Sequence, residues 1–280
     1  MQKITYLLIA FSMLITTLFG QAKNTAFSDF FNNDKSPAFN REMIIDIKGD
    51  SIAAYAFIAD GKKLKETIIL LHGLPGNDNQ HDIAQSLRRT GRNVIHFNYR
   101  GSWGSQGEFL YANSLEDVDE IIEYLSQPKT QKTLRIKPNA FVLLGRSFGG
   151  GIALIKGSTN KKVKKIIAIS SMNAGTRFKE NHDKNDLKGW EDYLNKQIML
   201  NVNPNEFLNE MIINRNIFNV ITYKEHLKNK KVLIIEDTKN NFSWIKKLTN
   251  IDYKLIKSDH SFISNRIHLT NTIINWLNKK

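Results

Sequence analysis

One stretch of the chain constrains its fold more than any other: thirteen residues, Asn139–Gly151, with the sequence N-A-F-V-L-L-G-R-S-F-G-G-G. Within it, Ala140–Leu144 is a continuous apolar run with no polar face, which is typical of a strand buried on both sides in a parallel sheet. The run stops at Gly145, and after the three glycines the chain becomes apolar again in a way that suits a buried helix. The stretch therefore predicts a strand, a tight turn and a helix, with Ser147 at the apex of the turn.

The glycines on either side of Ser147 have a physical reason. A residue at the apex of a sharp strand-to-helix turn has strained backbone geometry, and side chains two positions before and after it would collide, so glycine is favoured there. Such a turn lifts the Ser147 hydroxyl clear of the sheet and places it above a helix N-terminus with its free N–H groups. The G-x-S-x-G pattern also occurs by chance, but a strand before it and a helix after it favour a nucleophile elbow.

Length and composition set the outer limits. The 280 residues suffice for one large α/β domain with a sizeable core. The sequence contains no cysteine, which excludes disulfides, thiolate metal sites and a cysteine nucleophile. Nothing in it implies a metal ion or an organic cofactor.

The formal net charge of +13 raises the question of an anionic partner. The basic residues occur as separate pairs and not as one long block, which favours charge spread over solvated surfaces and predicts no nucleic-acid partner. The pairs are Lys62-Lys63, Arg88-Arg89, Lys161-Lys162, Lys164-Lys165 and Lys230-Lys231.

The N-terminal residues 1–22 differ from the rest of the chain. Lys3 precedes an apolar run, Ile4–Phe19, and small residues follow at positions 20–22. The run is shorter than the roughly 20 residues that cross a bilayer, so it predicts a cleaved signal peptide and a periplasmic or secreted protein. No other stretch is long and apolar enough to form a membrane span. Residues 23–42 are predicted to form an N-terminal arm.

The remaining residues, 43–280, alternate between short apolar runs and helical patterns, which predicts one α/β domain with a doubly wound, mostly parallel sheet. An antiparallel hairpin at the sheet edge is expected first, since two alternating segments flank Gly49-Asp50. The helices are expected at 79–89, from an N-cap at Ser114 onward, and at 261–277. The strands are expected at 43–47, 52–58, 67–71, 93–97, 140–144, 163–170, 231–236 and 251–257.

One long segment, 171–229, has helical periodicity and no clear strand. An insertion of this kind in an α/β fold is usually a cap or lid. We therefore predict a helical cap, and we expect the walls of the substrate pocket to come from this cap and from the glycine-rich loop 99–107.

A second loop carries a feature that supports chemistry at Ser147. His72-Gly73-Leu74-Pro75-Gly76 follows directly after an apolar strand. Gly73 lets the backbone approach a ligand closely, and the N–H of Leu74 can point at a developing negative charge. With the N–H of Phe148, it is predicted to form an oxyanion hole.

Together these motifs resemble the α/β-hydrolase superfamily, and the resemblance covers about residue 43 to the C-terminus. The chain is most similar to small esterases and to serine peptidases related to prolyl oligopeptidase and the serine aminopeptidases. The resemblance implies that Ser147 is the nucleophile and that His260, which follows the last strand, is the general base. His72 matches a histidine that supports the oxyanion loop. The matching segments are 72–76, 99–101 with Gly104, 145–150 and 258–262.

The chain departs from the family pattern at the triad acid. The family places an aspartate a few residues after the strand expected at 231–236, commonly as Gly-x-x-Asp, but here Asp237 stands at the glycine and Asn240 at the aspartate. Asp237 could serve through a shifted loop, or Asn240 could replace the acid. An amide there risks stabilising the wrong imidazole tautomer. Asp259 and Glu236 are further alternatives.

The sequence as a whole predicts an exported serine hydrolase that cleaves an ester or amide bond through a Ser147 acyl-enzyme. The substrate is expected to be a small-molecule ester or a short peptide, with an ester slightly favoured because a weak third triad member suits an easier leaving group. The alternative is a non-catalytic binding protein on the same fold with a degenerate triad.

Overall fold

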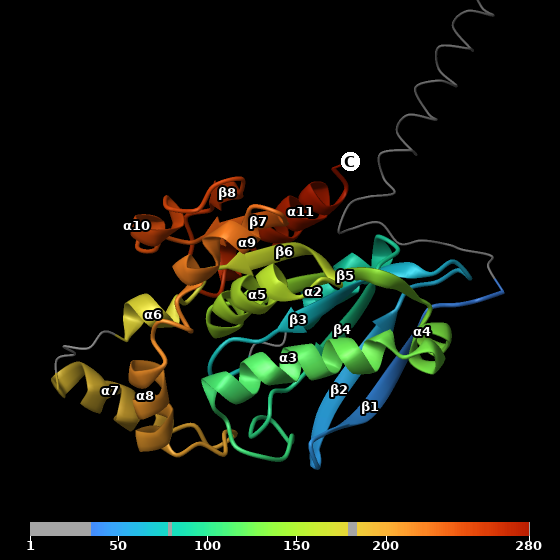
Figure 1. Ribbon diagram of the computed structural model, residues 1–280. Coiled ribbons are helices and arrows are strands. Elements are labelled where there is room, and N and C mark those ends of the chain that lie inside the picture. The colour runs from blue at the N-terminus through green and yellow to red at the C-terminus, as the bar shows by residue number, and fades with distance from the viewer. Residues whose placement is uncertain (1–34, 78–79, 179–183, 280) are drawn as a thin grey trace, which may run out of the picture.

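The computed structural model describes residues 35–77, 80–178 and 184–279 (Figure 1). The predicted signal peptide, 1–22, and most of the predicted arm, 23–42, lie outside these residues. β1 begins at Phe39, so positions 39–42 belong to the sheet and not to an arm.

An eight-stranded sheet runs through the domain in the order β1-β2-β4-β3-β5-β6-β7-β8. β1 pairs with β2, and β2 with β4, in antiparallel fashion, whereas every later pairing is parallel. The prediction of a mostly parallel sheet with an antiparallel hairpin at one edge is therefore confirmed. The strands are β1 (Phe39–Ile47), β2 (Asp50–Ile58), β3 (Lys65–Leu71), β4 (Asn93–Phe97), β5 (Ile136–Arg146), β6 (Val163–Ile169), β7 (Lys231–Glu236) and β8 (Asp252–Leu255).

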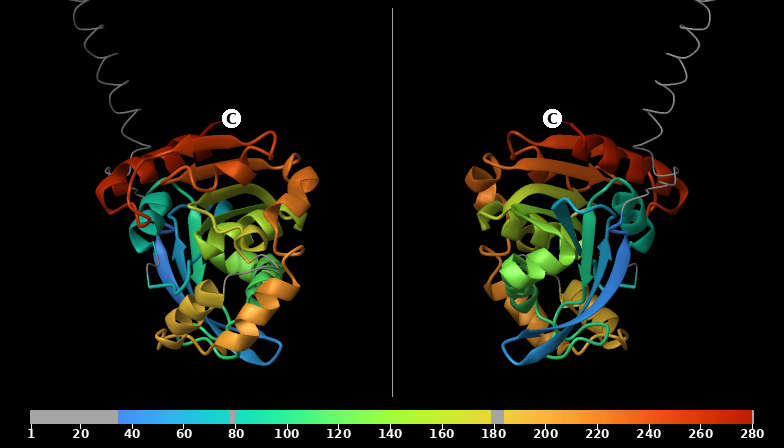
Figure 2. Two further views of the ribbon diagram at one scale, coloured as in Figure 1. Left: turned by 90° about the vertical axis from the view of Figure 1, so that its left-hand side faces the viewer. Right: turned by 90° about the vertical axis from the view of Figure 1, so that its right-hand side faces the viewer.

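Helices cover both faces of this sheet (Figures 1 and 2). One core lies under α2 (His81–Arg89) and α11 (Arg266–Leu277), which pack apolar residues such as Leu87 and Ile273 on the inner strands. The larger core lies on the other face under α3 (Tyr111–Ser126), α4 (Pro128–Leu134), α5 (Phe148–Thr159) and α9 (Lys224–Leu227). The central strands are consequently buried on both sides, which explains their continuous apolar runs.

Two helix starts differ from the prediction. α3 begins at Tyr111, and Ser114 is not its N-cap: the Ser114 hydroxyl donates back to the Leu110 carbonyl at 2.8 Å inside the first turn. The last helix, α11, begins at Arg266 and not at Ser261, after a short 3₁₀ turn, η2 (Ile263–Asn265). α4 was not predicted, although Pro128 occupies its first turn, a common helix start.

The segment 171–229 contains α6 (Ala174–Arg177), α7 (Lys184–Asn195), α8 (Pro204–Ile213), η1 (Val220–Tyr223) and α9. α7 and α8 stand apart from the sheet at the lower left of Figure 1. Among the described residues, the only β contact that this segment makes is an isolated bridge between Leu200 and Ser102. No helix in the described part of the chain is long and apolar enough to span a membrane.

Candidate active site

The residues singled out in the sequence meet at one edge of the sheet. The oxyanion loop follows β3, Ser147 follows β5, Asp237 follows β7 and His260 follows β8. These four strands are parallel, so their carboxyl ends share one edge, which is where α/β folds usually bind ligands.

Ser147 occupies a strained turn between β5 and α5. Its backbone has φ 54° and ψ −115°, which a non-glycine residue rarely adopts. The flanking glycines are required by space: a Cβ on Gly145 would lie 2.0 Å from the Gly149 carbonyl oxygen, and a Cβ on Gly149 would lie 2.2 Å from the Leu71 carbonyl oxygen. The Ser147 N–H donates to the Ile169 carbonyl at 2.8 Å, which ties the turn to β6. The surrounding strands thus hold Ser147 in the conformation expected of a nucleophile elbow.

An aromatic cluster supports the turn from below. The buried Phe148 ring lies 5.3 Å from Phe109, 5.1 Å from Tyr111 and 5.8 Å from Tyr99, measured between ring centroids. The Tyr99 and Tyr111 contacts are edge-on, the arrangement that aromatic pairs favour. The first residue of α5 is therefore anchored in the core, and the backbone N–H of Phe148 has a fixed position.

Two backbone N–H groups at the site have no hydrogen-bond partner among the described residues: those of Leu74 and Phe148. Both residues line the same cavity as Ser147. Gly73 brings the loop close to the elbow, because a Cβ on it would lie 3.4 Å from the Ser147 Cβ. Unpaired donors next to a serine hydroxyl are the arrangement that an oxyanion hole requires.

His72 supports this loop and is not exposed to the cavity. The Tyr99 N–H donates to its Nε2 at 3.4 Å, and its Nδ1 lies 2.8 Å from the Gly73 carbonyl oxygen. Burial lowers the pKa of His72 to about 4, so the ring is neutral at neutral pH, and its Nδ1–H can donate to Gly73. The structural role inferred for His72 agrees with this geometry.

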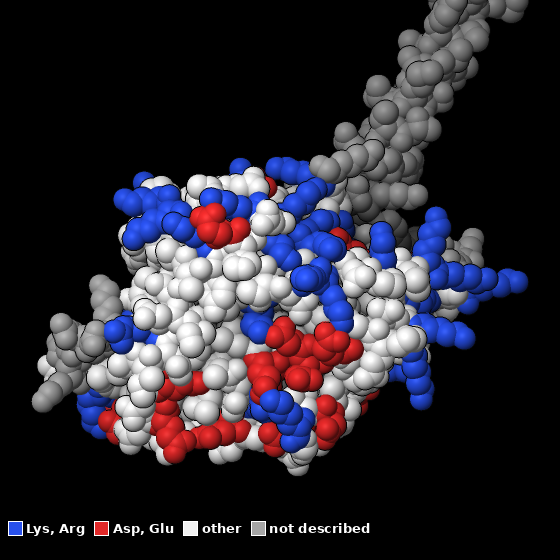
Figure 3. Space-filling view, viewed as in Figure 1, with Lys and Arg blue, Asp and Glu red and all other residues white. Residues whose placement is uncertain are grey.

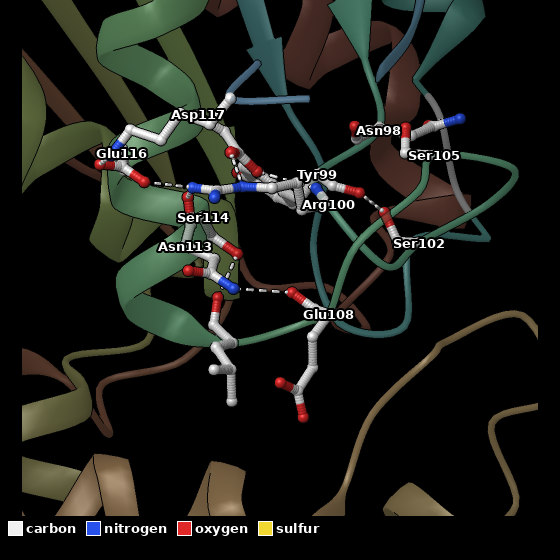
Figure 4. A network of polar contacts seen from close by, with 12 residues as sticks. Asn98, Tyr99, Arg100, Ser102, Ser105, Glu108, Asn113, Ser114, Glu116 and Asp117 are labelled. Carbon is white, nitrogen blue, oxygen red and sulfur yellow. Dashed lines mark hydrogen bonds and ion pairs between the residues drawn. The ribbon is translucent and has the colours of Figure 1, made fainter. Parts of the chain in front are cut away.

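The loop 98–109 braces the oxyanion loop from the outside. The Trp103 Nε1–H donates to the Pro75 carbonyl at 2.6 Å. Figure 4 shows how this bracing loop is fixed in turn: Arg100 reaches into α3, where its Nε donates to Asp117 at 2.5 Å and its terminal nitrogen to Glu116 at 2.6 Å. Asp117 is fully buried, and it also accepts the Arg100 N–H at 2.8 Å. The network therefore connects α3, through the loop 98–109, to the loop 72–76 that carries Leu74.

His260 and Asp237 lie next to each other. The His260 Nδ1 is 3.6 Å from the Asp237 Oδ2, and the other carboxylate oxygen of Asp237 accepts a hydrogen bond from the Ser170 hydroxyl at 2.8 Å. The Asp237 side chain is 12% exposed and the His260 ring 55% exposed. One oxygen of the aspartate is thus fixed, and the other faces the imidazole.

The alternative acids are placed elsewhere. Asn240 is exposed, and its backbone N–H bonds to Thr238. Asp259 accepts the N–H groups of Ser261 and Ile263 and closes its own turn. Glu236 is buried and accepts the Ser171 N–H at 3.0 Å. Of the residues weighed for the acid, Asp237 is the one paired with the His260 ring.

Ser147 and His260 are linked through Arg146, the residue before Ser147, and not by a direct hydrogen bond among the described residues. No hydrogen bond joins the Ser147 hydroxyl to His260 in the part of the chain that the structure describes. The guanidinium of Arg146, next to Ser147 in the chain, donates to the His260 carbonyl at 3.3 Å and holds the His260 loop against the turn. Catalytic hydrogen bonds in unliganded enzymes are often long and tighten when substrate binds.

A cavity of about 390 Å³ opens above Ser147. Its walls are largely apolar, and α7 of the predicted cap contributes Trp190 and Tyr193. The glycine-rich loop 99–107, which was also expected to form a wall, contributes none of the lining residues; it braces the oxyanion loop instead. The full lining is Leu74, Ser147, Phe148, Met172, Arg177, Asn185, Asp186, Gly189, Trp190 and Tyr193.

The aromatic residues that α7 contributes to the cavity, Trp190 and Tyr193, lie in the segment predicted to be the cap. The Trp190 ring lies 5.3 Å from Phe178 in a tilted contact and 5.9 Å from Tyr193 in an edge-to-face contact, measured between ring centroids. The Arg177 guanidinium lies 5.6 Å from the Trp190 ring centroid. The Tyr193 hydroxyl donates to the Leu74 carbonyl at 3.4 Å and so joins the cap to the oxyanion loop. Within the described residues, no cluster of three or more metal-ligating side chains occurs.

Comparison with known proteins agrees with the fold. Residues 66–204 match a family model described as the alpha/beta hydrolase fold. No match was found among curated protein sequences.

Several solved structures share the fold. Est1E from Butyrivibrio proteoclasticus, with ferulic acid bound, is 15% identical; the match covers 84% of this chain and 97% of that one, with a TM-score of 0.63. The Pyrococcus furiosus esterase Pf2001 is 15% identical; the match covers 89% of this chain and 97% of the esterase, with a TM-score of 0.58. The alpha/beta hydrolase GrgF from a Penicillium species is 12% identical; the match covers 86% of this chain and 98% of GrgF, with a TM-score of 0.61. With its eight-stranded sheet and the elbow at Ser147, the chain has the fold of the α/β-hydrolase superfamily.

Proposed function

We propose that this protein is a serine hydrolase that cleaves small carboxylic esters, with Ser147 as nucleophile, His260 as general base and Asp237 as the acid that orients His260. The observation that carries the proposal is the convergence at one sheet edge of a strained Ser147, two unpaired N–H groups and the Asp237–His260 pair. These are the parts that acyl transfer through a serine requires.

The reaction follows from these positions. The Ser147 hydroxyl oxygen bonds to the ester carbonyl carbon while its proton passes to His260, and the carbonyl oxygen becomes an oxyanion held by the N–H groups of Leu74 and Phe148. The C–O bond to the alcohol then breaks, and His260 returns the proton to the departing alkoxide. Water attacks the acyl-enzyme by the same sequence, which releases the acid and restores the serine. Asp237 stabilises the imidazolium in both halves.

The cavity indicates the size and character of the substrate. About 390 Å³ lined by Met172, Trp190 and Tyr193 suits a small acyl or aromatic group and not a folded polypeptide. The fold is shared with an esterase and with a protein that has ferulic acid bound, which supports an ester over a peptide. A short peptide with a small side chain is the next candidate.

The test is a substrate series on the purified protein. p-Nitrophenyl esters of increasing acyl length, assayed beside aminoacyl anilides, should show turnover of the esters, a preference for an acyl length that fits the cavity, and little anilide cleavage. Faster cleavage of the anilides than of the esters would reassign the protein to the peptidases. A Ser147→Ala variant that still cleaves both substrates at the normal rate would contradict the assignment of Ser147 as the nucleophile.

A second candidate is a non-catalytic binding protein on the same fold. The observation that favours it is the exposed His260 ring, 55% accessible and without a hydrogen bond to the Ser147 hydroxyl among the described residues. Such a protein would bind an ester in the cavity and leave it intact.

We also propose export, on the strength of the apolar run Ile4–Phe19 and the small residues that follow it. Protein isolated from the host's cell envelope or medium should begin near Gln21 to Lys23 when its N-terminus is sequenced. An intact Met1 on cytosolic protein would contradict export without affecting the catalytic proposal.

A further inference from the structure

Lysines that are separate in the sequence gather at one edge of the sheet. Lys164 and Lys165 are the second and third residues of β6, and Lys230 immediately precedes Lys231, the first residue of β7. The Cα of Lys165 is the register partner of the Cα of Lys231. Because parallel neighbours start at the same edge, two lysine pairs about 65 positions apart in the chain become adjacent. Figure 3 shows Lys and Arg concentrated over the upper part of the molecule, where these strands lie in Figure 1, and Asp and Glu lower down.

These lysines surround a groove. Two cavities, of about 310 and 370 Å³, share Lys165, Lys230, Lys231 and Asn250, so they form one continuous depression. We call it the lysine groove. Its remaining lining residues are Lys164, Lys228, Asn229, Val232, Ile251, Asp252, Trp276 and Lys279.

The positive charge of the lysine groove is only partly balanced. Lys165 pairs with Glu66 at 2.7 Å, and Lys228 with Glu225 at 2.7 Å. In the described part of the chain, no ion pair forms at Lys164, Lys230, Lys231 or Lys279. The one carboxylate in the lining, on Asp252, accepts the Trp276 Nε1–H at 2.6 Å. Six lysines therefore line the lysine groove against a single carboxylate, that of Asp252, and four of the six have no ion-pair partner among the described residues.

Lys230 is fixed at the centre of this space. Its ammonium donates to the carbonyl oxygens of Asn160 at 2.7 Å and Val163 at 2.8 Å. Burial, and the nearby charge of Lys164, lower the pKa of Lys230. A bound anion would reduce the electrostatic repulsion between ammonium groups that are held close together in this way.

We propose that the lysine groove is a binding site for the phosphate groups of an anionic ligand. Lysine ammonium groups bind phosphate oxygens as point charges, and a groove with four ammonium groups that have no carboxylate partner can hold more than one phosphate. The lysine groove offers no stacking platform for nucleic-acid bases, since Trp276 is 8% exposed and its N–H is already used. It lies at the amino ends of β6 and β7, opposite the edge that carries Ser147, so this site is independent of the proposed hydrolase.

The test uses two phosphate sources and the purified protein. Binding of tripolyphosphate is measured by calorimetry, and binding of phosphatidylglycerol vesicles by cosedimentation against phosphatidylcholine vesicles. Lys164→Gln/Lys231→Gln removes two exposed, unpaired charges from the lysine groove. Lys246→Gln/Lys247→Gln is the matched control, because it removes two exposed charges outside the groove and gives the same net charge.

The groove variant should bind at least about tenfold more weakly, and the control within about twofold of the unsubstituted protein. Lys164→Arg/Lys231→Arg should retain binding, and circular dichroism should show that each variant is folded. Binding of tripolyphosphate alone identifies a soluble phosphate ligand, and binding of the anionic vesicles alone identifies a lipid headgroup. Equal weakening in the groove variant and the control, or no binding of either source at millimolar phosphate, would overturn the proposal.

Discussion

The Oδ2 of Asp237 lies 3.6 Å from the Nδ1 of His260, while its Oδ1 is held by the Ser170 hydroxyl at 2.8 Å. Asp237 stands three positions before the place where the α/β-hydrolase pattern has its aspartate. The carboxylate nevertheless faces the imidazole, because the strand end and Ser170 fix it there. Asn240, at the family position, is exposed and makes no hydrogen bond to the ring among the described residues.

The first prediction concerns this pair. Asp237→Asn should lower kcat for the best ester by about 10³–10⁴-fold, because an amide stabilises the wrong imidazole tautomer and cannot balance the imidazolium. Asn240→Asp is the control and should change kcat by less than about twofold, since the Asn240 side chain is exposed and makes no hydrogen bond to His260 among the described residues. A rate gain in Asn240→Asp together with a silent Asp237→Asn would assign the acid to position 240.

The second prediction concerns the nucleophile and the base. Ser147→Ala and His260→Ala should each abolish ester turnover, and the double variant should be no slower than either single variant, since the two residues act as one unit. Steady-state rates of all three proteins, with circular dichroism as the control for folding, provide the measurement. Additive losses would show that the two residues act independently.

The third prediction concerns the stability of the elbow. Gly149→Ala would place a Cβ 2.2 Å from the Leu71 carbonyl and 2.5 Å from the His72 carbonyl, both of them backbone atoms that cannot move aside. Overpacking of this kind should lower the free energy of unfolding by about 1–3 kcal/mol. Gly189→Ala, in α7, meets nothing within 4 Å and should raise stability by about 0.5–1 kcal/mol through helix propensity. Urea unfolding measures both changes, and a neutral Gly149→Ala would contradict the packing described at the elbow.

The fourth prediction concerns Glu236, next to the proposed acid. Burial raises its pKa from 4.5 to about 7, against hydrogen bonds from Asn241 and Ser171. Because the folded protein holds the Glu236 proton more tightly than the unfolded chain does, the stability of the folded state is highest below pH 4.5. It falls as the pH rises through about 7, where the buried carboxyl group ionises. Glu236→Gln mimics the protonated acid, so the variant should gain stability relative to the unsubstituted protein between pH 4.5 and 8, by on the order of 2–3 kcal/mol. If the difference in unfolding free energy between Glu236→Gln and the unsubstituted protein does not change with pH, the pKa of Glu236 is not raised.

The sequence was sufficient for the parts of the fold that local chemistry determines. The apolar run before Ser147 and the glycines around it allow one conformation, a buried strand followed by a tight turn, and the structure shows that conformation. Continuous apolar runs likewise located the parallel strands. Ser114 was misplaced because a serine in the first helical turn can bond back to a carbonyl as readily as it can cap.

The remaining features depend on contacts between distant segments. Whether Asp237 or Asn240 faces His260 depends on the hydrogen bonds that join the loop after β7 to Ser170 and Ser171. These contacts link segments far apart in the chain, so the local sequence does not predict them. The lysine pairs were expected to be scattered, and the register of β6 against β7 brings two of them together. The loop 99–107 was expected to form a pocket wall because it is rich in glycine. In the structure, Trp103 of this loop donates a hydrogen bond to the Pro75 carbonyl and so supports the neighbouring loop.

The central claim is that Ser147 is an activated nucleophile, and labelling with a fluorophosphonate probe tests it most directly. The serine oxygen bonds to phosphorus and displaces fluoride, a step that needs both the base and the oxyanion donors. We expect one adduct, located at Ser147 by peptide mass spectrometry, absent from Ser147→Ala and formed far more slowly in His260→Ala. Folded protein that stays unlabelled at Ser147 under conditions that label a control serine esterase would contradict the account and favour the non-catalytic binding protein.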